Sequence, residues 1–205
     1  MVVEWSVECS ADDPVLVVPW SRAEAGAATV ETTADFVDLR ENPYDMDQIP
    51  EAEQNPPLMQ ALRALNAGRS PVFTAKCDAW ALDSEELEQL QLQLDISADS
   101  PDAKTGFASY VDLVWRDRTI FASFHQSEQL LHRLERLAAP IDEPLVMMDC
   151  VLRPALVDLT GPQEGFAVSL YVKALGPNLA AAKQAWGLAL EAIVALLRSR
   201  DIALA

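Results

Sequence analysis

Apolar and polar residues alternate in five segments of the chain, the period-two pattern typical of half-buried β-strands. These segments are Val2–Cys9, Val72–Trp80, Phe107–Trp115, Leu145–Leu152 and Phe166–Leu175. Shorter stretches of similar pattern predict four further strands, at Pro14–Pro19, Ala34–Leu39, Ile120–Phe124 and Ala155–Leu159. A substantial β-sheet is therefore expected.

Apolar residues spaced three and four apart predict two amphipathic helices. The first follows Asn55, an expected N-cap with prolines at the next two positions, and ends near Gly68. The second opens at Ser127 and stops before Pro140, which cannot continue a helix. Both helices carry a leucine stripe that would face a core.

A third helix is expected after Asn178 and is apolar nearly all round from Leu179 to Leu197. A helix of this kind is either enclosed by protein or forms an oligomer interface. Lys183 and Glu191 lie within it, and a charged residue at mid-bilayer costs roughly 2.5–3.5 kcal/mol, which argues against membrane insertion.

Three stretches lack one clear period. Residues 82–96 fit a helix and a strand about equally well, because their leucines match both spacings. Glu41–Asn55 is acidic and contains proline, and Ser97–Thr105 is a polar turn cluster, so both are expected to be loops.

The order of these elements favours an α+β fold. We expect one domain over residues 1–205, with a mainly antiparallel sheet and about three helices packed on one face. The chain around Cys77 and Gly106 is similar to the chain around Cys150 and Gly165, and a helix follows each. Two strand–strand–helix units of this kind would suit a ferredoxin-like arrangement.

Strand alternation predicts one uniformly apolar sheet face and one mixed face. Phe73 and Cys77 fall on the apolar, helix-covered side, as do Cys9 and Cys150, whereas Thr74 falls on the mixed side. Three cysteines so placed are expected to act as small core hydrophobes. The mixed face gathers eight charged and aromatic residues: Lys76, Asp78, Trp80, Tyr110, Asp112, Asp149, Tyr171 and Lys173.

These eight residues are the candidate site. Cross-strand neighbours lie about 4.5–5.5 Å apart, near enough for a salt-bridged network. Three interpretations remain open: an ordinary solvated sheet face, a shallow ligand pocket or dimer contact, and a catalytic site. Catalysis would need one carboxylate as base, with Lys76 or Lys173 stabilising an anion.

Charge divides the chain into two unequal halves. Of the net charge of −17 over 205 residues, residues 1–104 hold 21 acidic and six basic residues, and the apolar half at 105–205 holds 11 and nine. So acidic a chain is a poor partner for nucleic acid or anionic lipid, because both require clustered Lys and Arg. A basic protein would be attracted instead.

Common catalytic and cofactor signatures are absent from the sequence. Glycine-rich phosphate loops, nucleophile elbows and the zinc-protease motif are missing, so no cofactor is expected. The two histidines, His125 and His132, are expected to be solvated, because Ser127 as N-cap leaves His125 outside the helix, and no metal site is expected. Three widely spaced cysteines and the lack of a signal-peptide pattern favour the cytoplasm.

The sequence therefore favours a non-enzymatic cytoplasmic domain that self-associates and binds a small ligand or another protein. Self-association would use the third helix or the mixed sheet face. Two alternatives stay open: an acidic binder or inhibitor of a basic protein, and a small enzyme. The enzyme would use Asp78, Asp112 and Asp149 with Lys76 or Lys173 on the mixed face.

Overall fold

A computed structural model of the chain describes residues 1–10, 12–13, 15–18, 37, 39, 45–158 and 161–202. Six strands form one mixed sheet, and five of them follow the order β1–β5–β6–β4–β3. β5 pairs in parallel with β1 and with β2, whereas β5–β6, β6–β4 and β4–β3 are antiparallel. The strands are β1 (Val2–Val7), β2 (Leu16–Val18), β3 (Val72–Ala81), β4 (Thr105–Trp115), β5 (Val146–Asp158) and β6 (Pro162–Gly176).

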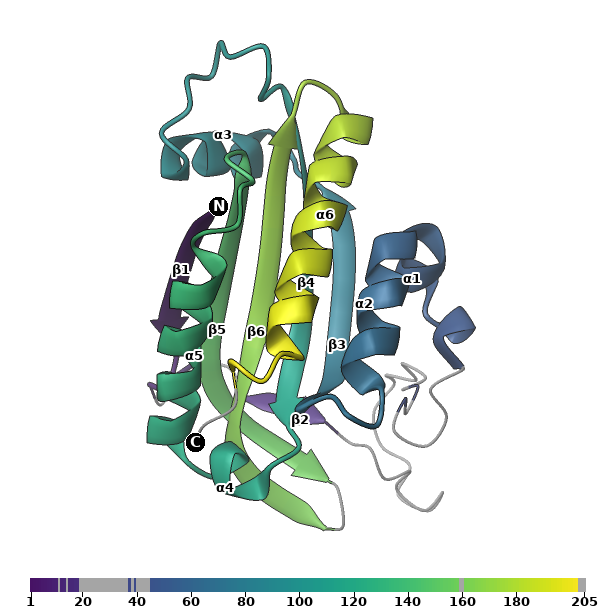
Figure 1. Cartoon of the computed structure of the whole chain (residues 1–205), viewed down its shortest axis with the longest axis vertical. Coiled ribbons are helices and arrows are strands. Elements are labelled where there is room, and N and C mark those ends of the chain that lie inside the picture. The colour runs from purple at the N-terminus through teal and green to yellow at the C-terminus, as the bar shows by residue number, and fades with distance from the viewer. Residues whose placement is uncertain are drawn as a thin grey trace.

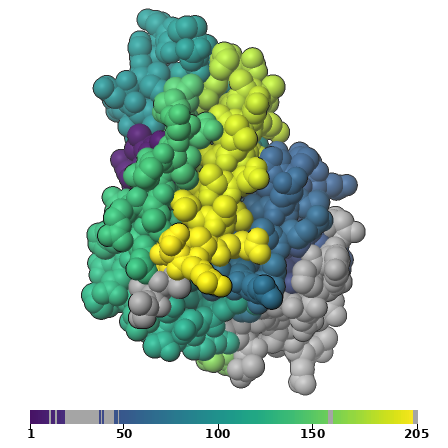
Figure 2. Space-filling view, viewed as in Figure 1, coloured from purple at the N-terminus to yellow at the C-terminus, as the bar shows by residue number. Residues whose placement is uncertain are grey.

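Six α-helices and one 3₁₀ helix occur in the described residues, which gives an α+β protein. They are η1 (Asp45–Gln48), α1 (Pro50–Gln54), α2 (Pro56–Asn66), α3 (Ser84–Gln93), α4 (Arg118–Phe121), α5 (Phe124–Ala138) and α6 (Leu179–Leu197). In front of the sheet, α6 runs between α5 and α2 (Figures 1 and 2). α6 is anchored by Trp186, whose Nε1 donates a 2.8 Å hydrogen bond to Ser109 Oγ and whose ring meets Phe107 edge-on.

α3 packs on the opposite face of the sheet from α6. Its Leu90 forms a small core cluster with Met147 and Leu175, whose neighbours Met148 and Ala174 belong to the main core. The stretch 82–96, which fitted a helix and a strand equally well in sequence, contains the helix α3 at Ser84–Gln93 and no strand. Both sheet faces are thus covered in part, since helices are not confined to one side.

A capping box starts α3. The Asp83 side chain accepts a hydrogen bond from the Glu86 backbone N–H, and the Glu86 carboxylate accepts one from the Asp83 N–H. This reciprocal pair satisfies two helix-end donors. The D-x-x-E spacing is visible in the sequence, so it could have decided between helix and strand.

The start of α5 differs from the prediction. Ser123, not Ser127, is the N-cap, and the Ser127 hydroxyl is buried and donates to the Ile120 carbonyl. The strand predicted at Ile120–Phe124 is wrong, because α4 ends at Phe121 and α5 begins at Phe124. His125 therefore lies inside α5, contrary to the expectation.

The loop predicted at Glu41–Asn55 contains η1 and α1 in its described part. α2 begins after Asn55 as predicted, but the Asn55 side chain does not cap it. Instead Asn55 Nδ2 donates to the Glu51 carbonyl and Oδ1 accepts from Lys183 Nζ on α6 at 3.1 Å. Asn55 thus joins α1, α2 and α6.

A β-bulge between Thr74 and Cys77 reverses the side-chain alternation within β3. Thr74 Oγ1 accepts a 2.7 Å hydrogen bond from Asn66 on α2, so it faces the helices rather than the mixed side. Phe73 pairs with Val114 on the other face. The predicted assignment of β3 side chains to the two sheet faces is therefore wrong before the bulge and right after it.

The three cysteines do not share one environment. Cys150 is buried and Cys77 is partly buried against the main core, as expected. Cys9 lies beyond the end of β1 and is exposed, because strand alternation no longer applies there. The strand predicted at Ala34–Leu39 lies outside the described residues except for positions 37 and 39.

α6 is the described helix that is long and apolar enough to cross a membrane by length and composition. A helix in a protein core meets the same criteria. Seven residues of α6, Trp186 among them, are buried where it packs against β4, β6 and α2. The apolar character of α6 is explained by this packing within the protein.

Candidate functional site

The strand register brings the eight candidate residues together on the sheet face opposite α6. Tyr110 on β4 lies directly between Asp78 on β3 and Tyr171 on β6, and Tyr171 is next to Asp149 on β5. Directly opposed residues point to the same side of a sheet. The rest lie in adjoining positions of the same strands on this face: Lys76, Trp80, Asp112 and Lys173.

A cavity of about 330 Å³ opens in the middle of this face and is called here the sheet-face cavity. Four of the eight candidates line it. The other four, Asp78, Trp80, Asp149 and Lys173, lie outside its lining. The cavity residues are Val15, Leu16, Lys76, Tyr110, Asp112, Arg153 and Tyr171.

Two tyrosines form an aromatic wall of the cavity. The ring centroids of Tyr110 and Tyr171 are 5.7 Å apart with the planes tilted by 40°. Burial, followed by the charge of Asp112, raises the pKa of Tyr110 to about 12, and burial also raises that of Tyr171. Both hydroxyls are therefore neutral at physiological pH and able to donate or accept hydrogen bonds.

Asp112 is the buried carboxyl of the cavity, with 5% of its surface exposed. It faces Ser169 across the β4–β6 pair, and the Ser169 hydroxyl donates to its Oδ1. Burial raises the pKa of Asp112, while this hydrogen bond and the positive charges of Arg153 and Lys76 oppose the rise. A carboxyl so placed accepts hydrogen bonds from whatever occupies the cavity.

Arg153 supplies a guanidinium on the β5 side. Its Nη2 is 3.0 Å from Glu8 Oε2, and its side chain is 16% exposed. Arg153 Nε is buried and has no hydrogen-bond partner among the described residues. An unsatisfied buried donor is costly, and Arg153 lines the cavity, so its guanidinium is the cationic group there whose hydrogen bonding is incomplete.

The four candidates outside the lining have structural partners or lie at the margin. Trp80 Nε1 donates to the Glu86 carboxylate of α3 at 3.0 Å, which ties this helix to the sheet. Lys173 Nζ lies 5.9 Å from the Tyr171 ring centroid. Burial raises the pKa of Asp149, and the charge of Lys173 opposes that rise.

The described residues contain no group of three or more His, Cys, Asp or Glu side chains able to hold a metal ion. His125 and His132 lie on α5, where their Nδ1 atoms are each 3.7 Å from Glu128 and Glu135, respectively. The His132 ring also meets Trp5 edge-on. The Trp5–His132 contact joins β1 to α5, whereas both His–Glu contacts lie within α5, and none of these residues lines the sheet-face cavity.

Arg153 is the cavity residue that sequence reasoning missed. The sequence prediction ended one strand at Leu152 and began another at Ala155, so Arg153 belonged to neither. In the structure β1 pairs with β5 up to Leu152 and β2 begins at Ala155, so Pro154 falls between the two partners. Continuing the alternation from Asp149 through Val151 would have placed Arg153 on the mixed face.

No protein-family model, curated protein or solved structure matches this chain.

Proposed function

We propose that this protein binds a small aromatic carboxylate in the sheet-face cavity. The observation that carries the proposal is a cavity in which Arg153, whose guanidinium is incompletely hydrogen-bonded, lies beside Lys76 and a wall of two tyrosines. A guanidinium presents its N–H groups in a plane that matches a carboxylate. The cavity volume is at the small end of the range for ligand pockets.

The remaining lining residues define the rest of the ligand. The rings of Tyr110 and Tyr171 offer apolar area for a planar group, and Val15 adds an aliphatic edge. Asp112 accepts a hydrogen bond, so a hydroxyl on the ligand ring would be recognised. A hydroxybenzoate has the carboxylate, the ring and the donor that these groups require.

The test is a calorimetric titration of the full chain with 4-hydroxybenzoate. We expect saturable binding, and we expect Arg153→Met to weaken it by roughly tenfold or more, since hydrogen bonds to charged groups contribute about 1.5–3 kcal/mol. Lys173→Met is the matched control, because Lys173 is on the same face outside the lining. It should change the affinity by less than about twofold.

Methyl 4-hydroxybenzoate, which lacks the negative charge, should bind far more weakly than 4-hydroxybenzoate. The proposal is wrong if the carboxylate does not bind, or if the Arg153→Met chain, shown to be folded by circular dichroism, binds it as well as the original chain. The enzyme alternative and the basic-partner alternative stay predictions: Lys76 and Asp112 line the cavity, while Asp78, Asp149 and Lys173 do not.

A further inference from the structure

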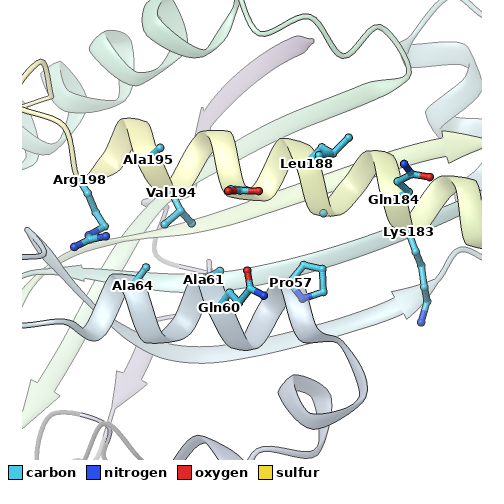
Figure 3. Close-up of a pocket in the computed structure, with 12 residues that line it drawn as sticks. Pro57, Gln60, Ala61, Ala64, Lys183, Gln184, Leu188, Val194, Ala195 and Arg198 are labelled. Carbon is cyan, nitrogen blue, oxygen red and sulfur yellow. The ribbon is translucent and has the colours of Figure 1, made fainter.

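A second surface, on the helical face of the molecule, has the chemistry of an interface. A groove of about 520 Å³ lies between α2 and α6 (Figure 3). Pro57, Gln60, Ala61 and Ala64 of α2 form one side of it. On α6, Gly187 allows the Pro57 ring of α2 to pack closely, because an added Cβ at Gly187 would meet that ring at 3.0 Å.

Beside this groove, α6 exposes one continuous stripe. Its members are spaced four, four, three and four residues apart, so they follow one face of the helix. Leu188 in the middle is 51% exposed, which is unusual for a large apolar side chain within a helix that is otherwise well packed. The exposed residues of this α6 stripe are Ala180, Gln184, Leu188, Glu191 and Ala195.

The α6 stripe reads the same way in both directions. A small residue, a polar residue, leucine, a polar residue and a small residue follow one another, centred between Gly187 and Leu188. Two copies of α6 packed antiparallel across a two-fold axis at that centre would match Ala180 with the partner copy's Ala195. Gln184 would face the partner copy's Glu191, and an amide donor suits a carboxylate acceptor.

The two-fold axis brings Leu188 to the α2–α6 groove. In that register Leu188 of each copy lies opposite Gly187 of the other, which is one of the residues that line the groove. A two-fold interface uses the same patch on both subunits, which must therefore be self-complementary. Ala180 and Ala195 at the two ends allow the helix backbones to approach closely.

Charge also favours this face for contact between two copies. The chain carries −17 overall, so copies repel each other through most of their surface. α6 carries a single acidic residue, Glu191, and the positively charged Lys183 and Arg198 line the same groove. The repulsion is therefore smallest where the α6 stripe lies.

We propose that the α6 stripe and the α2–α6 groove form a two-fold homodimer interface, with α6 antiparallel to α6 of the second copy. This inference is independent of the ligand proposed for the sheet-face cavity, which opens on the other side of the sheet. Both surfaces could then operate in one assembly.

The first experiment measures the mass of the full chain by sedimentation equilibrium. We expect a dimer whose dissociation constant rises by roughly tenfold or more in Leu188→Asp, as for loss of a central interface anchor. Leu92→Asp is the matched control, since Leu92 on α3 is 81% exposed and outside the proposed interface. That variant should retain the dimer.

The second experiment tests the antiparallel register. Gln184→Glu places two carboxylates opposite each other at both ends of the interface and should weaken the dimer. Combining it with Glu191→Lys creates a Glu–Lys pair at both places and should restore the dimer. Both sites are exposed, so the fold should tolerate these changes.

Four outcomes would overturn the inference. They are a monomer at every concentration reached, a dimer that Leu188→Asp leaves intact, a double variant that stays as weak as Gln184→Glu, and a face that instead binds a different protein while the chain remains monomeric. If the Leu188→Asp chain fails to fold, the charge exchange at Gln184 and Glu191 decides alone.

Discussion

Burial and charge conflict at Asp112. Burial raises its pKa above the ordinary value of 3.8, so the folded chain holds this proton to higher pH than the unfolded chain does. The contribution of Asp112 to stability is therefore fully present below that ordinary value and is lost as pH rises through the folded value. As pH rises through the folded value, ionisation of the buried Asp112 carboxyl destabilises the fold.

Asp112→Asn should consequently raise the melting temperature at neutral pH. The amide oxygen can still accept the Ser169 hydroxyl, while the buried charge is removed. We expect a gain of roughly 2–4 °C, which corresponds to about 1 kcal/mol for a chain of this size. Thermal unfolding from about pH 4 to about pH 8 measures it.

The pH dependence is the control for this substitution. The difference between the two chains should shrink towards acid pH, where Asp112 is protonated in both the folded and unfolded states. An Asn variant that is less stable than the original chain at neutral pH would show that the ionised carboxylate is held by partners stronger than its desolvation.

Individual residues were predicted best where the strand pattern continues without interruption. Tyr110, Asp112 and Tyr171 lie on the predicted face because β4 and β6 keep a regular alternation. Phe73 was misplaced because the sequence carries no clear signal for the bulge next to it. Arg153 was missed because one strand was predicted to end at Leu152 and the next to begin at Ala155.

At the scale of elements, the helices were predicted by their apolar spacing and misjudged at their ends. α6 begins after Asn178 as expected, and in the structure the Asn178 side chain caps it. α5 begins four residues before the expected start, because Ser123 and Ser127 are both plausible caps in sequence and only packing separates them. Ser127 is buried against Ile120, which a local pattern does not reveal.

The capping box of α3 gives a prediction about one element. Asp83→Ala removes the side chain that accepts from the Glu86 N–H and should lower the free energy of unfolding by about 1 kcal/mol. Because α3 covers Met147 and Leu175, its amide hydrogens and those of the adjacent strand ends should exchange faster. Hydrogen exchange measured by mass spectrometry reports both segments.

Ser84→Ala is the matched control for that substitution, since Ser84 is the first helical residue and does not cap. It should leave the exchange of α3 nearly unchanged. Equal acceleration in both variants would mean that helix propensity, and not the cap, limits the stability of α3.

At the scale of the whole molecule, the α+β class followed from the mixture of periods, but the mixed sheet did not. The parallel pairs of β5 with β1 and β2 join segments more than a hundred residues apart, and local patterns carry no information on such pairing. The second helical layer was missed for the same reason: α3 reaches the mixed face through contacts with distant strands.

Net charge makes the proposed dimer dependent on salt. Two chains of −17 repel each other, and the Debye length falls from about 30 Å at 0.01 M to about 8 Å at 0.15 M ionic strength. We expect the dimer dissociation constant to fall as salt is raised over this range, as measured by sedimentation. A dimer that weakens with salt would instead be held by charge pairs between the copies.

The central claim is that the sheet-face cavity is a binding site, and locating a ligand tests it most directly. Crystals of the full chain soaked with 3-bromo-4-hydroxybenzoate allow the bromine to be found by its anomalous scattering. We expect bromine in the cavity between Tyr110 and Tyr171, with the carboxylate on Arg153 and Lys76. Bromine found only elsewhere, such as in the α2–α6 groove, would contradict it.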